Sequence, residues 1–117
     1  MGKIDSNNGW HGCDLDGTLA VYTSWNGGEI GRPIPLMMAR VKQWLANGEQ
    51  VKIFTARAAD PVEVKKINAW SYKHIGVVLE VTNVKDKDMI DLWDDRAVQV
   101  IENTGVRVDS FMPKSRS

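Results

Sequence analysis

Apolar and polar positions alternate along the chain in a pattern that predicts short strands separated by helices. Residues 10–14 form a short, largely apolar run that an Asp-Gly-Thr turn breaks at once, as at the end of a buried strand. Comparable short apolar runs follow later in the chain and predict three further strands. A fifth strand is predicted at one of two later positions. These strands are expected at residues 51–55, 77–81 and 89–93, and at either 98–101 or 106–108.

Two segments have the three-to-four residue spacing of amphipathic helices. The first begins at Pro35, a residue that suits a first helical turn, and ends before Gly48, a natural C-terminal cap. The second opens on Asp60, with a proline next and a glutamate three places on, and it continues to residue 75. Residues 19–30 contain an Asn-Gly-Gly turn signal, which favours a hairpin or flap over a helix.

Strands that alternate with helices at this spacing predict one α/β domain. We expect a three-layer, doubly wound, Rossmann-like fold, with a mainly parallel five-stranded sheet covered on both faces. A chain of 117 residues has room for a single core, so the prediction is one domain over residues 1–117. Its polar ends, residues 1–8 and 113–117, are expected to be flexible.

Composition and charge narrow the class of protein. Hydrophobic residues make up 43% and charged residues 26% of the chain, and no apolar run approaches the ~20 residues of a membrane helix. We therefore expect a soluble protein with no membrane partner. The start of the chain lacks the pattern of a secretory signal, and a lone cysteine forms no internal disulfide, so the expected location is cytoplasmic. Fifteen basic and fifteen acidic residues cancel, so nucleic acid is expected only as a substrate, and the oligomeric state stays open.

In an open parallel sheet, ligands bind beyond the carboxyl ends of the strands. The residues just past the predicted strands are therefore candidates for the site. They include two pairs of carboxylates, a hydroxyl group and several cations. These residues are Asp14 and Asp16, Thr55 and Arg57, Lys85 and Lys87, and Asp94 and Asp95.

This set of side chains meets the needs of phosphoryl transfer. Asp14 is placed to attack phosphorus, and Asp16 to protonate the leaving oxygen and later deprotonate a water molecule. Thr55 offers a hydroxyl to a phosphoryl oxygen, and Lys85 or Lys87 offers an ammonium group.

A carboxylate and a phosphate repel each other, so a hard cation is expected between them. Mg²⁺ prefers one or two carboxylates together with water and phosphate oxygens. Asp14 with Asp94 or Asp95 supplies those carboxylates, which makes Mg²⁺ the expected cofactor.

The same residues resemble the motifs of the haloacid dehalogenase superfamily. Asp14-Leu15-Asp16-Gly17-Thr18-Leu19 is similar to the first motif of that family, and the strand that ends in Thr55 is similar to the second. Lys85 corresponds to the third motif, with Lys87 as the alternative, and Trp93-Asp94-Asp95 to the acidic fourth; together they span residues 10–97.

The resemblance implies a role for each of these residues. Asp14 would be nucleophile and metal ligand, and Asp16 would be the acid/base whose main-chain carbonyl also binds the metal. Thr55 and Lys85 would hold the phosphoryl group, and the pair at 94 and 95 would complete the magnesium site. Thr55-Ala56-Arg57 resembles a variant in small capless members, which makes Arg57 a candidate substrate contact, and no segment is long enough for a cap domain.

Other residues have simpler structural explanations. His11 and His74 lack ligand-spaced partners, and Cys13 points away from Asp14 by the two-residue period of a strand, so all three are expected to be structural. Tyr22 and Trp25 in the predicted flap either pack the flap or stack on a substrate.

The sequence therefore predicts a magnesium-dependent phosphohydrolase that cleaves a phosphomonoester through an aspartyl-phosphate intermediate. A phosphatase acting on nucleotides or on polynucleotide 3′ ends is the alternative enzyme. A binding or regulatory module with low turnover on the same fold is the alternative from another class.

Overall fold

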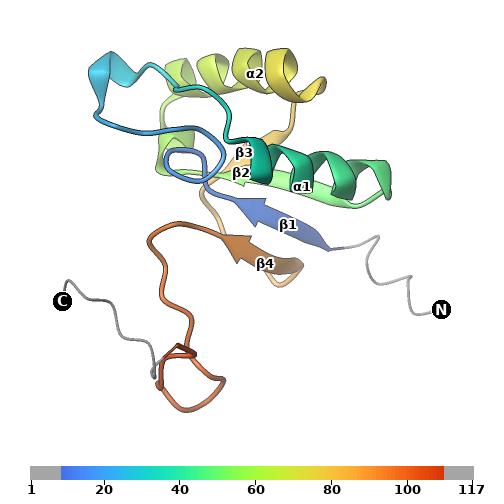
Figure 1. Cartoon of the computed structure of the whole chain (residues 1–117), viewed down its shortest axis with the longest axis vertical. Helices are drawn as coiled ribbons and strands as arrows, with labels where there is room; N and C mark the ends of the chain where they lie inside the picture. The colour runs from blue at the N-terminus through green and yellow to red at the C-terminus, as the bar shows by residue number, and fades with distance from the viewer. Residues whose placement is uncertain (1–8, 110–117) are drawn as a thin grey trace.

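The computed structural model describes residues 9–109, which form an α/β fold with a parallel sheet and two α-helices (Figure 1). The strands are β1 (Trp10–Cys13), β2 (Gln50–Phe54), β3 (Glu80–Thr82) and β4 (Met89–Trp93). The helices are α1 (Pro35–Ala46) and α2 (Pro61–Ile75), with short 3₁₀ turns η2 (Asn26–Gly28) and η3 (Ala56–Ala59). No helix in this part of the chain is both long and apolar enough to cross a bilayer.

The sheet has the strand order β3-β2-β1-β4, with every neighbouring pair parallel. Cys13, the last residue of β1, pairs with Ile53 of β2 on one side and with Trp93 of β4 on the other. The backbone amide of Asp14 continues this pairing by donating to the carbonyl of Trp93 at 2.9 Å. The carboxyl ends of these three strands therefore meet at one edge of the sheet.

The predicted fifth strand is wrong for the described residues, which form four strands. Residues 98–101 and 106–108 pair with each other instead, through an antiparallel bridge between Val100 and Arg107 and a bond of 2.7 Å from the Ile101 amide to the Val106 carbonyl. This loop projects away from the sheet (Figure 1). A local pairing closes only a short loop, which makes it less costly in entropy than a fifth strand beside β4.

Both helices cover the same face of the sheet, whereas the sequence predicted helices on both faces (Figure 1). The reason lies in the connections. The crossovers from β1 to β2 and from β2 to β3 step in one direction, and right-handed crossovers then place both helices on one side. The return from β3 to β4 has only residues 83–88, too few for a crossover helix. Trp10 covers part of the other face, with the Lys52 ammonium 4.5 Å from its ring.

Helix α2 has the boundaries that its sequence predicts. The Asp60 carboxylate caps the first turn by accepting from the Val62 amide at 2.9 Å, and Pro61 follows it. Gly76 ends the helix in the left-handed conformation, with a φ of 100°, where a side chain would be strained. The capping-box role of Glu63 is not realised, because its carboxylate binds Arg57 and Lys66 instead.

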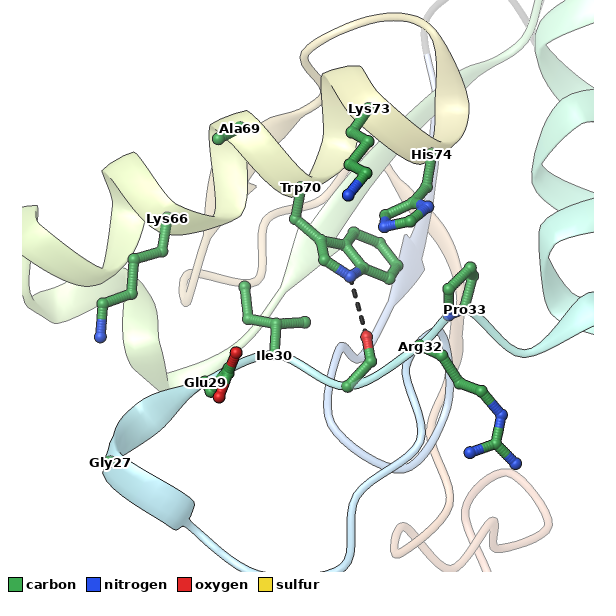
Figure 2. Close-up of a pocket in the computed structure, with 11 residues that line it drawn as sticks. Gly27, Glu29, Ile30, Arg32, Pro33, Lys66, Ala69, Trp70, Lys73 and His74 are labelled. Atoms are coloured by element: carbon green, nitrogen blue, oxygen red, sulfur yellow. Dashed lines mark hydrogen bonds between the residues drawn. The ribbon is translucent and has the colours of Figure 1, made fainter.

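Residues 20–33, which we call the flap, form a loop with paired ends. The Val21 amide donates to the Arg32 carbonyl at 2.9 Å, and a side chain at Gly31 would collide with the Val21 carbonyl. Figure 2 shows how the flap lies against α2: the Trp70 indole donates its Nε1 proton to the Gly31 carbonyl at 2.9 Å. The flap is therefore held at both ends and against the helix.

His11 of β1 joins three parts of the chain. Its Nδ1 lies 2.7 Å from Asp91 of β4, its Nε2 lies 2.7 Å from Glu49 before β2, and its ring stacks on Trp44 of α1 at 4.1 Å. Burial lowers the pKa of His11, but the two carboxylates outweigh burial and raise the pKa above its ordinary value. His11 and Cys13 are both buried, which is consistent with the structural roles predicted for them.

We expect replacement of His11 to destabilise the protein more in acid than in base. A histidine whose pKa is raised in the folded state stabilises fully below its unfolded pKa of ~6.5, and this stabilisation is lost as pH rises through the folded pKa. His11→Gln should cost about 2 kcal/mol at pH 5.5 and less at pH 8.5, measured as the free energy of unfolding in urea. His74→Gln is the control, since no carboxylate pairs with that ring among residues 9–109; an equal pH trend there would contradict the assignment.

Candidate active site

Three carboxylates converge at the edge where β1 and β4 end. Asp14 directly follows β1, and Asp94 and Asp95 directly follow β4. One carboxylate oxygen from each of the three lies within 4.8 Å of the others, a separation at which one cation can bind them all. The pairing of Cys13 with Trp93 produces this convergence, because it aligns the two strand ends.

The cluster is incompletely neutralised by its surroundings. Burial, the charge of Asp94 and a hydrogen bond with Asp95 together raise the pKa of Asp14 to about 7. Thr18 restrains the other side of the cluster: its hydroxyl accepts from the Asp95 amide at 3.1 Å and lies 3.4 Å from the Asp95 carboxylate. A cation bound among these carboxylates would be stabilised by their negative charges.

Asp16 lies apart from the three carboxylates and binds Arg57. The Nε and Nη2 atoms of Arg57 each lie 2.8 Å from a different oxygen of Asp16, which is the two-point geometry of a strong ion pair. Arg57 is buried, and its Nη1 donates to Glu63 at 2.7 Å and to the Gly28 carbonyl of the flap. Burial lowers the pKa of this guanidinium, but its two carboxylate partners outweigh burial and raise it.

A cavity of about 540 Å³ contains most of these groups. Its lining brings together three of the four predicted carboxylates, the predicted hydroxyl and the predicted arginine. The lining residues are Asp14, Asp16, Tyr22, Trp25, Phe54, Thr55, Ala56, Arg57, Asp94 and Arg96. Thr55 is buried and its oxygen accepts from the Arg57 amide at 3.2 Å, so its hydroxyl proton stays available to a ligand.

The predicted lysine does not line this cavity. Lys85 is exposed and has no ion-pair partner within residues 9–109, and Lys87 is exposed beside Asp88 at 3.4 Å. The cations of the cavity are Arg57 and Arg96 instead. The choice of Lys85 over Lys87 as a phosphoryl contact therefore stays a prediction.

Sequence reasoning missed two residues of this region. Arg96 follows the aspartate pair after β4, so the rule that places ligand sites at strand ends would have found it. Glu63 gave no such signal, because its position three residues after Asp60 also fits a helix cap.

A larger hollow of about 640 Å³ lies between the flap and α2 (Figure 2). Its lining includes Ile30, Trp70 and two lysines, Lys66 and Lys73. Glu29 is the one carboxylate among the residues that line it, so it offers no cluster of metal ligands. Among the described residues, the carboxylates that could bind a metal or act on a substrate are concentrated in the cavity at the end of β1.

We expect Arg57→Lys to lower stability and loosen the flap, because one ammonium cannot bridge Asp16, Glu63 and the Gly28 carbonyl. The loss should be about 2 kcal/mol or more in the free energy of unfolding, with faster hydrogen exchange at the Gly28 amide. Arg107→Lys is the matched control, since that arginine pairs with Asp109 in the half-exposed loop and should change stability by less than about 1 kcal/mol. Unchanged exchange at Gly28 would contradict the role of Arg57 in holding the flap.

Comparisons of this chain with protein-family models, with curated proteins and with solved structures give no match.

Proposed function

We propose that this chain is a magnesium-dependent phosphohydrolase that cleaves a phosphomonoester through an aspartyl-phosphate intermediate. One observation carries the proposal: carboxylate oxygens of Asp14, Asp94 and Asp95 lie within 4.8 Å of one another at the ends of two paired parallel strands. Asp16 lies two residues further on, at the rim of the same cavity. The motif resemblance to the haloacid dehalogenase superfamily, as a capless member, points to the same chemistry.

The donor set fits magnesium. All three groups are carboxylates, the hard oxygen ligands that Mg²⁺ prefers, and one oxygen of each lies within 4.8 Å of the others. Bound there, Mg²⁺ would neutralise the carboxylates and the phosphoryl oxygens, so that an anionic nucleophile can approach an anionic substrate.

The reaction divides into two displacements at phosphorus. In the first, an Asp14 oxygen forms a bond to phosphorus, the bond from phosphorus to the ester oxygen breaks, and the leaving alcohol receives a proton from Asp16. In the second, a water molecule attacks the acyl phosphate and gives its proton to Asp16. Asp14 regains its carboxylate as inorganic phosphate leaves.

Arg57 and Thr55 have supporting roles in this scheme. Arg57 fixes the position of the Asp16 carboxylate in the free site, with bonds of 2.8 Å to both oxygens. An incoming phosphoryl group would compete for this guanidinium, which would free the Asp16 carboxyl group to reach the leaving oxygen. The Thr55 hydroxyl and the Arg96 guanidinium line the cavity and are further donors for phosphoryl oxygens.

We expect Asp14→Asn to abolish Mg²⁺-dependent hydrolysis of p-nitrophenyl phosphate while the fold is kept. The amide has nearly the same shape as the carboxylate but is too poor a nucleophile to form the phosphoenzyme. Turnover with and without Mg²⁺ measures the effect, and circular dichroism checks the fold. Asp88→Asn, which changes an exposed carboxylate outside the cavity, should keep full activity.

Retained turnover in Asp14→Asn would point to direct attack by water. Absence of Mg²⁺-dependent turnover in the unmodified chain on any phosphomonoester would favour a binding or regulatory module.

We expect the defect of Asp16→Asn to depend on the leaving group. An alkyl alcohol needs a proton as it departs, whereas p-nitrophenolate does not, so the loss should be about tenfold or more greater for an alkyl phosphate. Arg96→Gln serves as the control, because it removes a donor for the phosphoryl group from the same cavity and leaves the ion pair of Asp16 with Arg57 in place, and it should slow both esters alike. Equal losses for the two esters in Asp16→Asn would argue against the acid/base role.

A further inference from the structure

The rim of the candidate active site includes two aromatic side chains that the proposed chemistry does not use. Tyr22 and Trp25 belong to the flap, line the same cavity as Asp14, and are 48% and 52% exposed. Single exposed aromatic residues are common on protein surfaces and need no explanation. Two of them at the mouth of a cavity that contains a carboxylate cluster form a surface on which a ligand ring can stack.

Trp25 is fixed in orientation before any ligand arrives. The Arg57 guanidinium lies 4.7 Å from the centre of its ring, and the Gly28 amide donates to the Trp25 carbonyl at 2.7 Å. Arg57 is itself held by Asp16 and Glu63. The ring therefore has a charged group on one face and still leaves half of its surface exposed.

The segment that carries both rings is also constrained. Its ends pair through Val21 and Arg32, and Trp70 of α2 holds Gly31 (Figure 2). Binding to a preorganised surface loses little conformational entropy, so stacking on it contributes to affinity.

The dimensions and charges of the cavity narrow the choice of ligand. A volume of about 540 Å³ lies within the range of small-molecule sites and exceeds what one phosphoryl group needs. Of the two cations in the lining, Arg57 is already paired with carboxylates, which leaves Arg96. A nucleic-acid strand is bound through a series of cations along its backbone, and the lining offers no such series.

We propose that the substrate is a nucleoside monophosphate, whose base stacks on Trp25 and Tyr22 while its phosphate lies against Asp14. This inference rests on the proposed function, in which the phosphate is cleaved at Asp14. It adds that the leaving group is a nucleoside. Stacking of a base on an aromatic side chain contributes about a tenfold gain in affinity.

The test compares two esters that differ only in the base. Adenosine 5′-monophosphate should have a kcat/KM about tenfold or more above that of ribose 5-phosphate, with Mg²⁺ present. Trp25→Leu and Tyr22→Leu should each reduce that ratio several-fold. Tyr72→Leu, which alters an exposed aromatic residue on α2 outside the cavity, should leave the ratio unchanged.

Equal kcat/KM values for the two esters, or a ratio that survives both leucine variants, would overturn the inference. A 3′-phosphorylated oligonucleotide that is hydrolysed faster than adenosine 5′-monophosphate would also overturn it, in favour of a nucleic-acid end.

Calorimetric binding of the two esters separates this inference from the proposed function. One outcome would be that neither ester is hydrolysed, but that adenosine 5′-monophosphate binds more tightly than ribose 5-phosphate and loses this advantage in Trp25→Leu. That outcome would support the stacking surface and contradict the proposed hydrolysis. Equal binding of the two esters rejects the stacking surface, whatever the turnover.

Discussion

Repulsion among carboxylates is the constraint on which the candidate site depends. β1 lies between β2 and β4, so its end carries Asp14 against Asp94 and Asp95. Charges of one sign this close raise the free energy of the folded chain unless a proton, a cation or a basic side chain offsets them. Asp16 is paired with Arg57, and Asp95 is hydrogen-bonded to Thr18. For Asp14, burial together with the charge of Asp94 and a hydrogen bond with Asp95 raises the pKa to about 7. A cation bound beside Asp14 would therefore stabilise the folded chain, because no described basic side chain forms an ion pair with Asp14.

Arg57 links parts of the molecule that are distant in sequence. Its guanidinium contacts Asp16 beyond β1, Glu63 in the first turn of α2, and the carbonyl and ring of flap residues Gly28 and Trp25. A buried cation of this kind is stable only while its partners stay in place, because any partner that leaves exposes an unpaired charge to a poorly solvated site. The flap and the carboxylate of Asp16 are therefore coupled through Arg57, so that a movement of the flap alters the ion pair of Asp16.

The sequence predicted the local elements better than their assembly. Both helices have the expected boundaries, because Pro35 begins α1 and because Asp60 and Gly76 cap the two ends of α2. The convergence of Asp14 with Asp94 and Asp95 followed from the rule for parallel sheets, whereas the ion pair between Asp16 and Arg57 did not, since no spacing encodes it. The fifth strand failed because residues 98–108 satisfy their backbone locally, and the second helical layer failed because the link from β3 to β4 is too short.

The burial of Cys13 gives this chain a built-in reporter. Cys13 is the single cysteine of the sequence, is fully buried, and immediately precedes the candidate nucleophile. Burial and the charges of Asp91 and Asp14 raise the pKa of its thiol to about 12, so the reactive thiolate is nearly absent while β1 stays in place. Alkylating reagents can modify it only when β1 separates from its neighbours. The rate of alkylation therefore reports how often β1, the strand that precedes Asp14, opens, and no label has to be introduced.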